Sequence, residues 1–384
     1  MIDGYDLNHD LESINRALKS DMPEAAIFYC GRALEVTSAR AISALSLDPG
    51  TQVFANLDML ERLSCITRPA LYLGHSLRRL ANDARHILRP LTGQDADFAA
   101  LCLGPWLQWY MTDYFRGPQT AVADPSFGIH SPLATGAVAD TLDLLNRASV
   151  EDVSDRLLAL ASEEVVKLPA LASMVAEVLI SDGRADDAQS VLKAALAHVP
   201  QDLRLNQLYA LGRRRAGHPD EAIALLQKLT GKYSEDEETL GITAGALKSS
   251  WAKGQGPVDA LSKALKLYAK GFQVSRERNL YLGVNGAAIE FWQGDPRAKD
   301  HAAHIVEIFA KRNAQLAESG IDVGSQRDYY DMVTEAEARL LAGEGGRDLY
   351  AQAFRRFAAR KGDIEGTKVQ ANRSIALLGG EPIT

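Results

Sequence analysis

A cluster of polar and ionisable side chains stands in the segment LRRLANDARH, residues Leu77 to His86. Three arginines, an asparagine, an aspartate and a histidine fall within these ten positions. A histidine can transfer a proton in a reaction, and an arginine can stabilise negative charge on a phosphate. The set therefore admits three interpretations: an active site, a grip on an anionic ligand, or the polar core of a helix bundle.

The composition of the chain limits these alternatives. The 384 residues are 46% hydrophobic and 24% charged, which is typical of a globular protein and argues against wholesale disorder. The formal net charge is -8, so the chain as a whole has no electrostatic footprint for nucleic acid. We therefore do not expect a nucleic-acid partner unless a local patch binds it.

The cysteines and the first residues indicate the compartment. Cys30, Cys65 and Cys102 are odd in number and widely spaced, which predicts reduced thiols and no disulfide framework. No CxxC spacing occurs, so a zinc knuckle is not expected. The start, MIDGYDLNHD, lacks a basic segment followed by an apolar core, and no apolar run approaches the ~20 residues of a membrane span. The sequence predicts a cytoplasmic protein without membrane contact.

The elements that position any site are predicted to be helices throughout. Alanine and leucine dominate the apolar residues, helical periodicity recurs along the chain, and alternating strand patterns are nearly absent. The periodicity breaks at residues 116–136, where glycine, proline, serine and threonine accumulate. We therefore predict an all-α protein with an N-terminal helical bundle over residues 1–115, a linker over 116–139 and an α-solenoid over 140–384.

A repeat of 34 residues follows the predicted linker. The pairs that share this separation are Ala176 and Ala210, Gly183 and Gly217, Ala188 and Ala222, and Leu192 and Leu226. Small residues let the two helices of a hairpin approach closely, and the glycine permits a tight turn between them. The period is that of tetratricopeptide repeats. A third, looser unit with Ala244, Ala260 and Ala264 completes the number that a stable array needs.

A sharper pattern follows in residues 268–295 and 327–344. Its motifs are Tyr-x-x-Gly-Phe, Tyr-x-Gly-(Ile/Val)-Asn-x-Ala, and Asp-Tyr-(Trp/Tyr) leading into Thr-x-Glu-Ala. The first motif corresponds to Tyr268, Gly271 and Phe272. The second corresponds to Tyr281, Gly283, Val284, Asn285 and Ala287. The third corresponds to Asp328, Tyr329, Tyr330, Thr334, Glu335 and Ala336. The region, residues 255–360, resembles the TRAF-binding central regulatory domain of stress-activated mitogen-activated protein kinase kinase kinases, whose bacterial relatives are called TPR-S.

This resemblance implies a sensor of nucleotide-derived signals. The residues expected to hold such a ligand are Tyr268, Lys270, Arg276, Arg278, Tyr281, Asn285, Asp328, Tyr329 and Glu335. Lys270, Arg276 and Arg278 would supply the contacts to phosphate. For Asn285 a second interpretation stays open, in which its amide caps or bridges neighbouring helices.

The N-terminal region, residues 20–115, resembles a helical domain of unknown function that is found fused to restriction enzymes and other defence proteins. The matching positions are Arg32, Leu34 and Glu35, then Leu77, Arg78, Leu80, Asn82, Ala84 and His86. That family is related to the HEPN fold, in which an arginine and a histidine make a metal-independent ribonuclease. The resemblance implies a catalytic set of Arg78, Arg79 and His86, with the histidine as acid or base for attack by a 2′-hydroxyl.

The alternative for this N-terminal segment is structural. Arg79 precedes His86 with six residues between them, as the nuclease requires, but the match to the family selects Arg78 instead. A basic surface that could track RNA is also missing. We therefore favour a polar helix-packing core of Arg78, Asn82 and His86, or a dimer contact, over catalysis.

Other clusters carry weaker signals. His301 and His304 lie one helical turn apart near Glu307, but no further ligand follows. Helix-surface histidines are therefore favoured over a metal site, and no metal or other cofactor is predicted. The segment GEGGRD follows a helix and predicts a C-cap and turn. A C-terminal basic stretch predicts a solvated helix face or a dock for an acidic partner. Its members are Arg355, Arg356, Arg360 and Lys361.

The sequence thus predicts a non-catalytic regulatory or sensor protein of a bacterial conflict or stress-signalling system. Its solenoid would bind a partner protein or effector encoded nearby, a nucleotide-derived small molecule, or both. Its N-terminal bundle would allow a homo-oligomer. Two alternatives stay open: a HEPN-like ribonuclease controlled by the solenoid, and an assembly scaffold without a small-molecule ligand.

Overall fold

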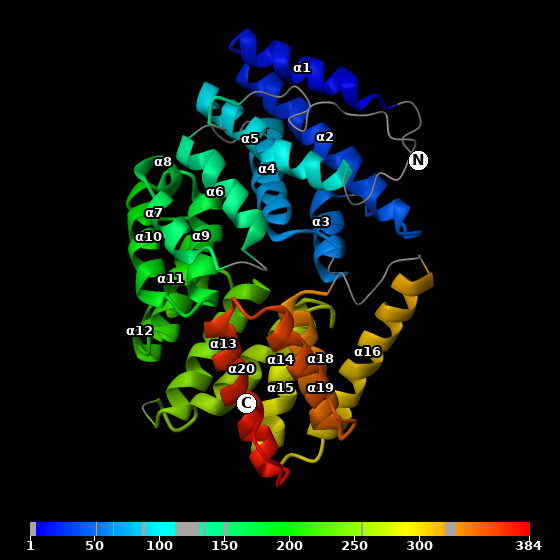
Figure 1. The fold of residues 1–384 in the computed structure, drawn as a ribbon, viewed down its shortest axis with the longest axis vertical. Helices are drawn as coiled ribbons and strands as arrows, with labels where there is room; N and C mark the ends of the chain where they lie inside the picture. The colour runs from blue at the N-terminus through cyan, green and yellow to red at the C-terminus, as the bar shows by residue number, and fades with distance from the viewer. Residues whose placement is uncertain are drawn as a thin grey trace. The chain divides into compact units, whose positions relative to one another are not determined.

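The computed structural model describes residues 5–50, 52–63, 65–86, 90–111, 131–133, 136–148, 152–254, 256–318 and 327–384. They form helices α1 to α16 and α18 to α20 and contain no strand (Figure 1), so the predicted all-α fold is confirmed. Within them, no helix is long and apolar enough to cross a membrane. Most of the predicted linker, residues 116–139, lies outside them, so the predicted domain boundaries stay predictions.

The chain divides into two compact units. Unit 1 comprises Met1–Asn146 and Leu316–Asp322, and unit 2 comprises Arg147–Gln315 and Val323–Thr384.

Unit 1 is a helical bundle organised around one long helix, α2. Its helices are α1 (Leu7–Lys19), α2 (Pro23–Ala44), α3 (Val53–Arg62), α4 (Arg68–His86), α5 (Gly93–Trp109) and α6 (Gly136–Arg147). α2 packs against α1, α3, α4 and α5. The indole of Trp106 on α5 is fully buried and donates a hydrogen bond to Thr37 Oγ1 on α2 at 2.8 Å.

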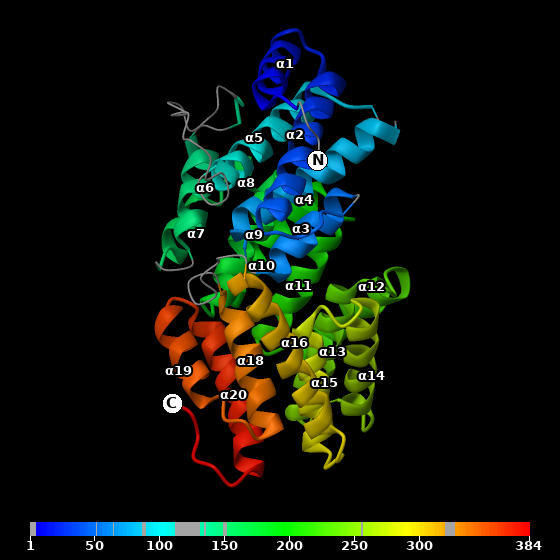
Figure 2. The same ribbon diagram turned by 90° about the vertical axis from the view of Figure 1, so that its right-hand side faces the viewer.

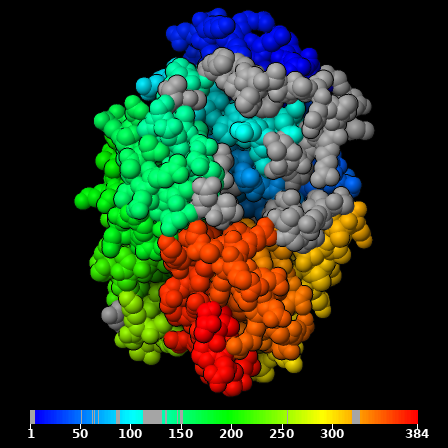
Figure 3. Space-filling view, in the orientation of Figure 1, coloured from blue at the N-terminus to red at the C-terminus, as the bar shows by residue number. Residues whose placement is uncertain are grey.

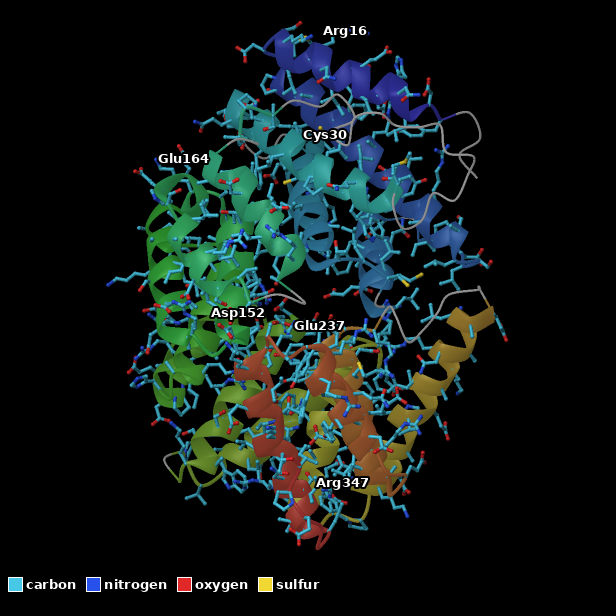
Figure 4. All side chains as sticks on the ribbon, in the orientation of Figure 1. Arg16, Cys30, Asp152, Glu164, Glu237 and Arg347 are labelled. Carbon is cyan, nitrogen blue, oxygen red and sulfur yellow. The ribbon has the colours of Figure 1, made fainter. Side chains whose placement is uncertain are left out.

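Local sequence signals explain where these helices begin and how closely they pack. Pro23 stands at the start of α2, where its missing N–H costs nothing. Thr92 and Asp95 form a reciprocal capping box at the start of α5. A Cβ at Gly31 would lie only 2.5 Å from the Cβ of Ala81, so the close approach of α2 and α4 requires glycine. Cys30 on α2 (Figure 4) and the other two cysteines are buried and free, as predicted.

Unit 2 is a solenoid of helical hairpins (Figure 2). Its helices are α7 (Ser154–Leu160), α8 (Glu163–Val166), α9 (Pro169–Ser181), α10 (Ala185–His198), α11 (Leu203–Arg215), α12 (Pro219–Lys232), α13 (Glu237–Ala252), α14 (Ala260–Val274), α15 (Leu280–Trp292), α16 (Ala298–Glu318), α18 (Tyr329–Ala342), α19 (Arg347–Arg356) and α20 (Lys361–Leu377). Consecutive helices pack from α9 through α15, and the first helix of each hairpin also contacts its counterpart in the next, α9 with α11 and α11 with α13.

The 34-residue repeat corresponds to these hairpins. The paired residues Ala176 and Ala210 are fully buried on α9 and α11. Gly183 and Gly217 occupy the turns within the first two hairpins with φ of +89° and +94°, a conformation that glycine adopts at low cost. Gly254 takes φ +68° in the third. The predicted tetratricopeptide-type architecture is confirmed.

The hairpin pattern continues past the point where the sequence period is lost. α15, α16 and α18 share one apolar core that includes Val284, Ile305, Phe309 and Leu341. α18 and α19 form the next hairpin. Gly343, with φ +83°, caps the C-terminus of α18, and Gly346, with φ +102°, precedes α19, so the predicted cap and turn are confirmed.

The last helix, α20, returns to the first hairpin and closes the solenoid. It packs against α9, α15 and α18, and the space-filling view shows α18 to α20 as one continuous face (Figure 3). A Cβ at Gly362 would lie 2.6 Å from backbone atoms of Gly183, so glycine is required at this contact. Arg360 Nη2 donates to Ser181 Oγ at 3.2 Å, and Lys361 Nζ donates to Asp152 Oδ2 at 2.9 Å.

These contacts correct one sequence prediction. Arg355 and Arg356 are exposed, as a solvated helix face requires. Arg360 and Lys361 instead bind residues of the first part of the solenoid, because the closure brings them there. The predicted solvated face is therefore wrong for Arg360, whose side chain is 19% exposed, whereas the side chain of Lys361 is 63% exposed while it pairs with Asp152.

The two histidines of α16 lie on its surface, as predicted. His301 Nδ1 pairs with Glu290 Oε2 at 2.6 Å, and His304 Nε2 pairs with Glu277 Oε2 at 2.9 Å. Both rings are about half exposed. In the part of the chain that the structure describes, no three His, Cys, Asp or Glu side chains are grouped so that they could hold a metal ion.

Candidate functional site

Polar side chains converge on the inner side of the solenoid. On α15, α18 and α20 they recur at spacings of four or seven residues, which places them on one face of each helix. We call the set the inner cluster: Arg214, Arg215, Lys248, Tyr268, Tyr281, Asn285, Tyr330, Glu337, Asp363 and Gln370. The cluster exists because α20 closes the solenoid and brings its polar face against α15 and α18.

Lys248 on α13 lies at the centre of the inner cluster. Its ammonium donates hydrogen bonds to Asn285 Oδ1 and to Gln370 Oε1. It also lies 5.5 Å from the centroid of the Tyr268 ring, a cation–π distance. Gln370 Nε2 in turn donates to Glu337 Oε2 at 2.6 Å. Lysine and glutamate are thus joined through an amide and make no direct ion pair.

The ionisation of this pair is strongly perturbed. Burial lowers the pKa of Lys248, and the nearby guanidinium groups of Arg214, Arg215 and Arg373 lower it further against the opposing effect of Glu337. Burial raises the pKa of Glu337. Both charged forms are therefore costly, which is a common property of functional sites.

A second group of contacts surrounds Asp363 on α20. Its carboxylate accepts hydrogen bonds from Tyr330 Oη at 2.6 Å, from Arg360 Nε at 2.9 Å and from Arg215 Nη2 at 3.0 Å. Burial opposes its ionisation, but Arg360, Arg215 and the hydrogen bond from Tyr330 outweigh burial, and the pKa of Asp363 is lowered. This carboxylate is therefore fully satisfied within the chain.

Glycines make room for the arginines of the inner cluster. Gly245 on α13 faces the guanidinium of Arg214, and Gly366 on α20 faces that of Arg215. A Cβ at either glycine would overlap a guanidinium nitrogen. The two glycines thus leave room for two guanidinium groups beside α13 and α20.

The inner cluster has more cations than anions and includes unpaired polar atoms. Arg214, Arg215 and Lys248 face two carboxylates, those of Glu337 and Asp363. Among the described residues, Arg214 Nε, Arg215 Nε and Glu337 Oε1 are buried and have no hydrogen-bond partner. Most buried polar groups in proteins are paired. The arrangement therefore suits an anionic ligand that would supply acceptors to these donors.

Three residues predicted from the sequence lie in this cluster. Tyr268 is fully buried on α14, and burial raises the pKa of its hydroxyl, with the adjacent Tyr281 raising it further. Tyr281 is 37% exposed, and its ring meets that of Tyr330 edge to face at 6.1 Å. Asn285 Nδ2 donates to the Tyr281 carbonyl at 2.8 Å while its Oδ1 accepts from Lys248, so Asn285 bridges α13 and α15.

The other six predicted residues lie elsewhere. Three cations are exposed at the end of α14 and in the turn after it: Lys270, Arg276 and Arg278. Asp328 caps α18 by accepting from Asp331 N at 2.7 Å. Tyr329 is buried and donates to Thr367 Oγ1 at 2.7 Å. Glu335 is buried between Arg327 and Arg339, with N–O distances of 2.8 and 2.7 Å.

Sequence reasoning missed the cations of the inner cluster, although one signal was present. Arg214 and Lys248 are 34 residues apart, so they occupy the same position in two successive repeats. When a polar residue recurs at a position of the repeat that faces inward, polar side chains are expected to line the inner surface of the solenoid. Glu337, Asp363 and Gln370 carry no such signal, because their helices lie beyond the visible repeat.

The N-terminal candidates do not form a complete site within the described residues. The guanidinium of Arg78 lies 5.4 Å above the ring of Phe54, and Arg79 Nη2 donates to Ser76 Oγ at 3.2 Å. The side chain of His86 lies outside the described part of α4, so the ribonuclease stays a prediction. Asn82 is exposed, and its predicted place in a polar core is therefore wrong.

Comparison with known proteins identifies one family segment. Residues 183–290 match the Tetratricopeptide Repeats-Sensor family, TPR-S, a match that overlaps the predicted sensor segment in residues 255–290 and spans well under half of the chain. It includes Arg214, Arg215, Lys248 and Asn285. Comparison with curated protein sequences gave no match.

Two solved structures are distantly similar over most of the chain. They are the human IFIT1 dimer with m7Gppp-AAAA and the human IFIT1 dimer with PPP-AAAA, each with 13% sequence identity and a TM-score of 0.39. The similarity covers 98% of this chain and 91% and 92% of the respective IFIT1 chains.

Proposed function

We propose that this chain is a non-catalytic sensor whose solenoid binds a nucleotide-derived anionic ligand at the inner cluster. The observation that carries the proposal is the surplus of cations in the interior, where Arg214, Arg215 and Lys248 lie together and, among the described residues, Arg214 Nε and Arg215 Nε are buried without a hydrogen-bond partner. Charge-assisted hydrogen bonds from such groups to phosphate are among the strongest that proteins make. The match of residues 183–290 to the TPR-S family supports the same role.

The sensor would act through a partner protein. Tetratricopeptide-type solenoids present extended surfaces for other proteins. We place the chain in a cytoplasmic bacterial conflict or stress-signalling system, with an effector encoded nearby as its partner. Helix α20 would connect ligand and partner. It supplies Asp363 and Gln370 to the inner cluster, and it also covers one side of the solenoid, where a partner protein could contact it.

The test is a titration of the full chain with nucleoside monophosphates, nucleoside diphosphates and cyclic dinucleotides. A ligand at one hundred times its Kd stabilises the folded state by about 2.7 kcal/mol, which appears as a rise in Tm. We expect at least one of these nucleotides to raise the Tm, and we expect Lys248→Gln to weaken its binding about tenfold or more in calorimetry.

The matched control for Lys248 is Lys266→Gln, since Lys266 is exposed on the neighbouring helix α14. This variant should bind as the wild-type chain does. A wild-type chain that no member of the panel stabilises would contradict the proposed function. Equal losses in Lys248→Gln and Lys266→Gln would contradict the assignment to the inner cluster.

A further inference from the structure

A surface hollow of about 480 Å³ lies where α13, α15 and α20 meet. Its lining is predominantly apolar and consists of Trp251, Trp292, Val369, Arg373, Ala376 and Leu377. The volume falls within the range of about 300–1,000 Å³ that is usual for small-molecule sites. None of the sequence motifs points to these residues.

The two tryptophans of the hollow stack on each other, and we call the pair the aromatic platform. Their rings are nearly parallel, with an interplanar angle of 11° and centroids 6.1 Å apart. Trp292 Nε1 donates to Ser374 Oγ at 2.9 Å, which fixes the orientation of its ring against α20. Both tryptophans are partly exposed. Parallel, accessible indole faces are suited to stacking with a planar π-system.

Arg373 stands over this platform with no anionic partner. Its guanidinium lies 4.6 Å from the centroid of Trp251 and 5.3 Å from that of Trp292. Among the described residues it makes no ion pair and no hydrogen bond. By contrast, Arg312 and Arg327 each pair with Asp331. The donors of Arg373 are therefore available to an anion.

The hollow adjoins the inner cluster through Trp292. Lys248 Nζ lies 5.8 Å from the centroid of the Trp292 ring, and Arg373 lies 5.3 Å from the same centroid. Gln370, which accepts from Lys248, precedes Arg373 by one turn of α20. The ring of Trp292 thus belongs to the aromatic platform and also lies close to the cations Lys248 and Arg373.

We propose that the hollow binds the base of a nucleotide, which stacks on Trp251 and Trp292 while Arg373 turns from the indole faces to the phosphate. The inference rests on the proposed function and specifies how the ligand is held. Stacking selects an aromatic ring, and Arg373 together with Lys248 selects an anion. A phosphate without a base would contact the cations of this site but not the two tryptophans.

The experiment compares ADP, GDP and inorganic pyrophosphate by isothermal titration calorimetry with the full chain. Removing an aromatic ring that stacks on a base typically weakens binding about tenfold or more. We expect Trp251→Ala to lose at least tenfold in affinity for ADP or GDP and to leave pyrophosphate binding unchanged. Trp251→Phe should recover most of the loss, and Arg373→Met should weaken both kinds of ligand.

The matched control is Phe54→Ala in unit 1, since Phe54 is 49% exposed and also carries an arginine, Arg78, over its ring. Circular dichroism confirms that each variant is folded, and Trp251→Phe decides the outcome if Trp251→Ala does not fold. Wild-type affinity for ADP and GDP in the folded tryptophan variants overturns the inference and leaves the proposed function standing. If the wild-type chain binds pyrophosphate as tightly as ADP, the inference is likewise overturned and the proposed function stands. No binding of any of the three by the wild-type chain overturns the inference, and the proposed function falls with it only if the rest of the nucleotide panel also fails to raise the Tm.

Discussion

The interiors of the two units differ in how they treat charge. In unit 1 the fully buried carboxylate of Asp10 is paired with Arg32, Trp106 donates to Thr37, and burial raises the pKa of the Cys30 and Cys102 thiols so that both stay protonated. In unit 2 the inner cluster buries Lys248 and Arg215 beside carboxylates. Burying charges is expensive and seldom increases stability. Under the proposed function, the surplus of cations in the interior of unit 2 would serve binding.

The largest expected effect comes from removing a neutral core side chain from unit 1, which tests whether the interiors of the two units are stabilised independently. Trp106→Ala should destabilise unit 1 by about 4 kcal/mol, because it leaves a cavity and removes the indole donor from Thr37 Oγ1. Hydrogen exchange followed by mass spectrometry should show α2 losing about three orders of magnitude in protection.

Protection of α13 in unit 2 should stay at the wild-type value in Trp106→Ala. The control is Thr37→Val, which keeps the packing but leaves the indole N–H unpaired, at a cost of about 1–3 kcal/mol. Equal loss of protection in α2 and α13 would show that the two interiors are not independent.

Removing a charge from unit 2 is the next largest change. Asp363→Ala leaves Arg215 and Arg360 without their shared carboxylate, and breaking a buried ion pair in this way should cost about 3 kcal/mol. Protection should fall in α20 and in α9, on which α20 closes. Asp363→Asn, which keeps an acceptor for Tyr330, should cost less.

The matched control for Asp363 is Asp348→Ala, since Asp348 lies exposed in the first turn of α19. Its loss removes only a favourable interaction with the helix dipole, worth about 0.3–1 kcal/mol. If Asp363→Ala proved as stable as Asp348→Ala, the charges of the inner cluster would not hold the closure of the solenoid.

Mild acid should affect unit 1 through one histidine. Burial, assisted by Arg78 and Arg79, lowers the pKa of His75 from 6.5 to about 3. The native state therefore keeps His75 neutral, whereas the unfolded state takes up a proton below its pKa of 6.5. The stability contributed by His75 is present above pH 6.5 and is lost progressively as the pH falls from 6.5 towards 3.

At pH 5.5 this loss should amount to about 1 kcal/mol, seen as reduced protection of α4 relative to pH 7. His75→Gln should remove this part of the pH dependence, whereas His198→Gln, at an exposed position of α10, should retain it. A His75→Gln chain that lost stability with pH as the wild type does would refute the assignment.

Much of the fold was predictable from local patterns. The 34-residue spacing of Ala176 and Ala210 placed both on buried helix faces, and Gly183 and Gly217 marked the turns between the helices. Part of the candidate site was predictable too, since Tyr268, Tyr281 and Asn285 lie in the inner cluster. These residues lie on the consecutive helices α14 and α15, so short-range spacing was enough to group them.

The remaining site residues come from helices that are distant in sequence. Lys248 meets Gln370 across 122 positions, and Arg215 meets Asp363 across 148. Local spacing carries no information on which distant helices meet. The exposed Lys270 and Arg278 looked equally suitable in sequence, because charge type alone does not distinguish an inward side chain from an outward one.

The amino-acid sequence by itself determined the helices, the repeat and the turns, because helical periodicity, small residues and glycine act over a few positions. Only the tertiary structure decided which polar side chains come together in the inner cluster. That decision depends on the closure of α20 onto α9, where Gly362 meets the backbone of Gly183. Only this closure brings Arg215, Lys248 and Arg373 near one another, and burial then strengthens the electrostatic interactions of their charges.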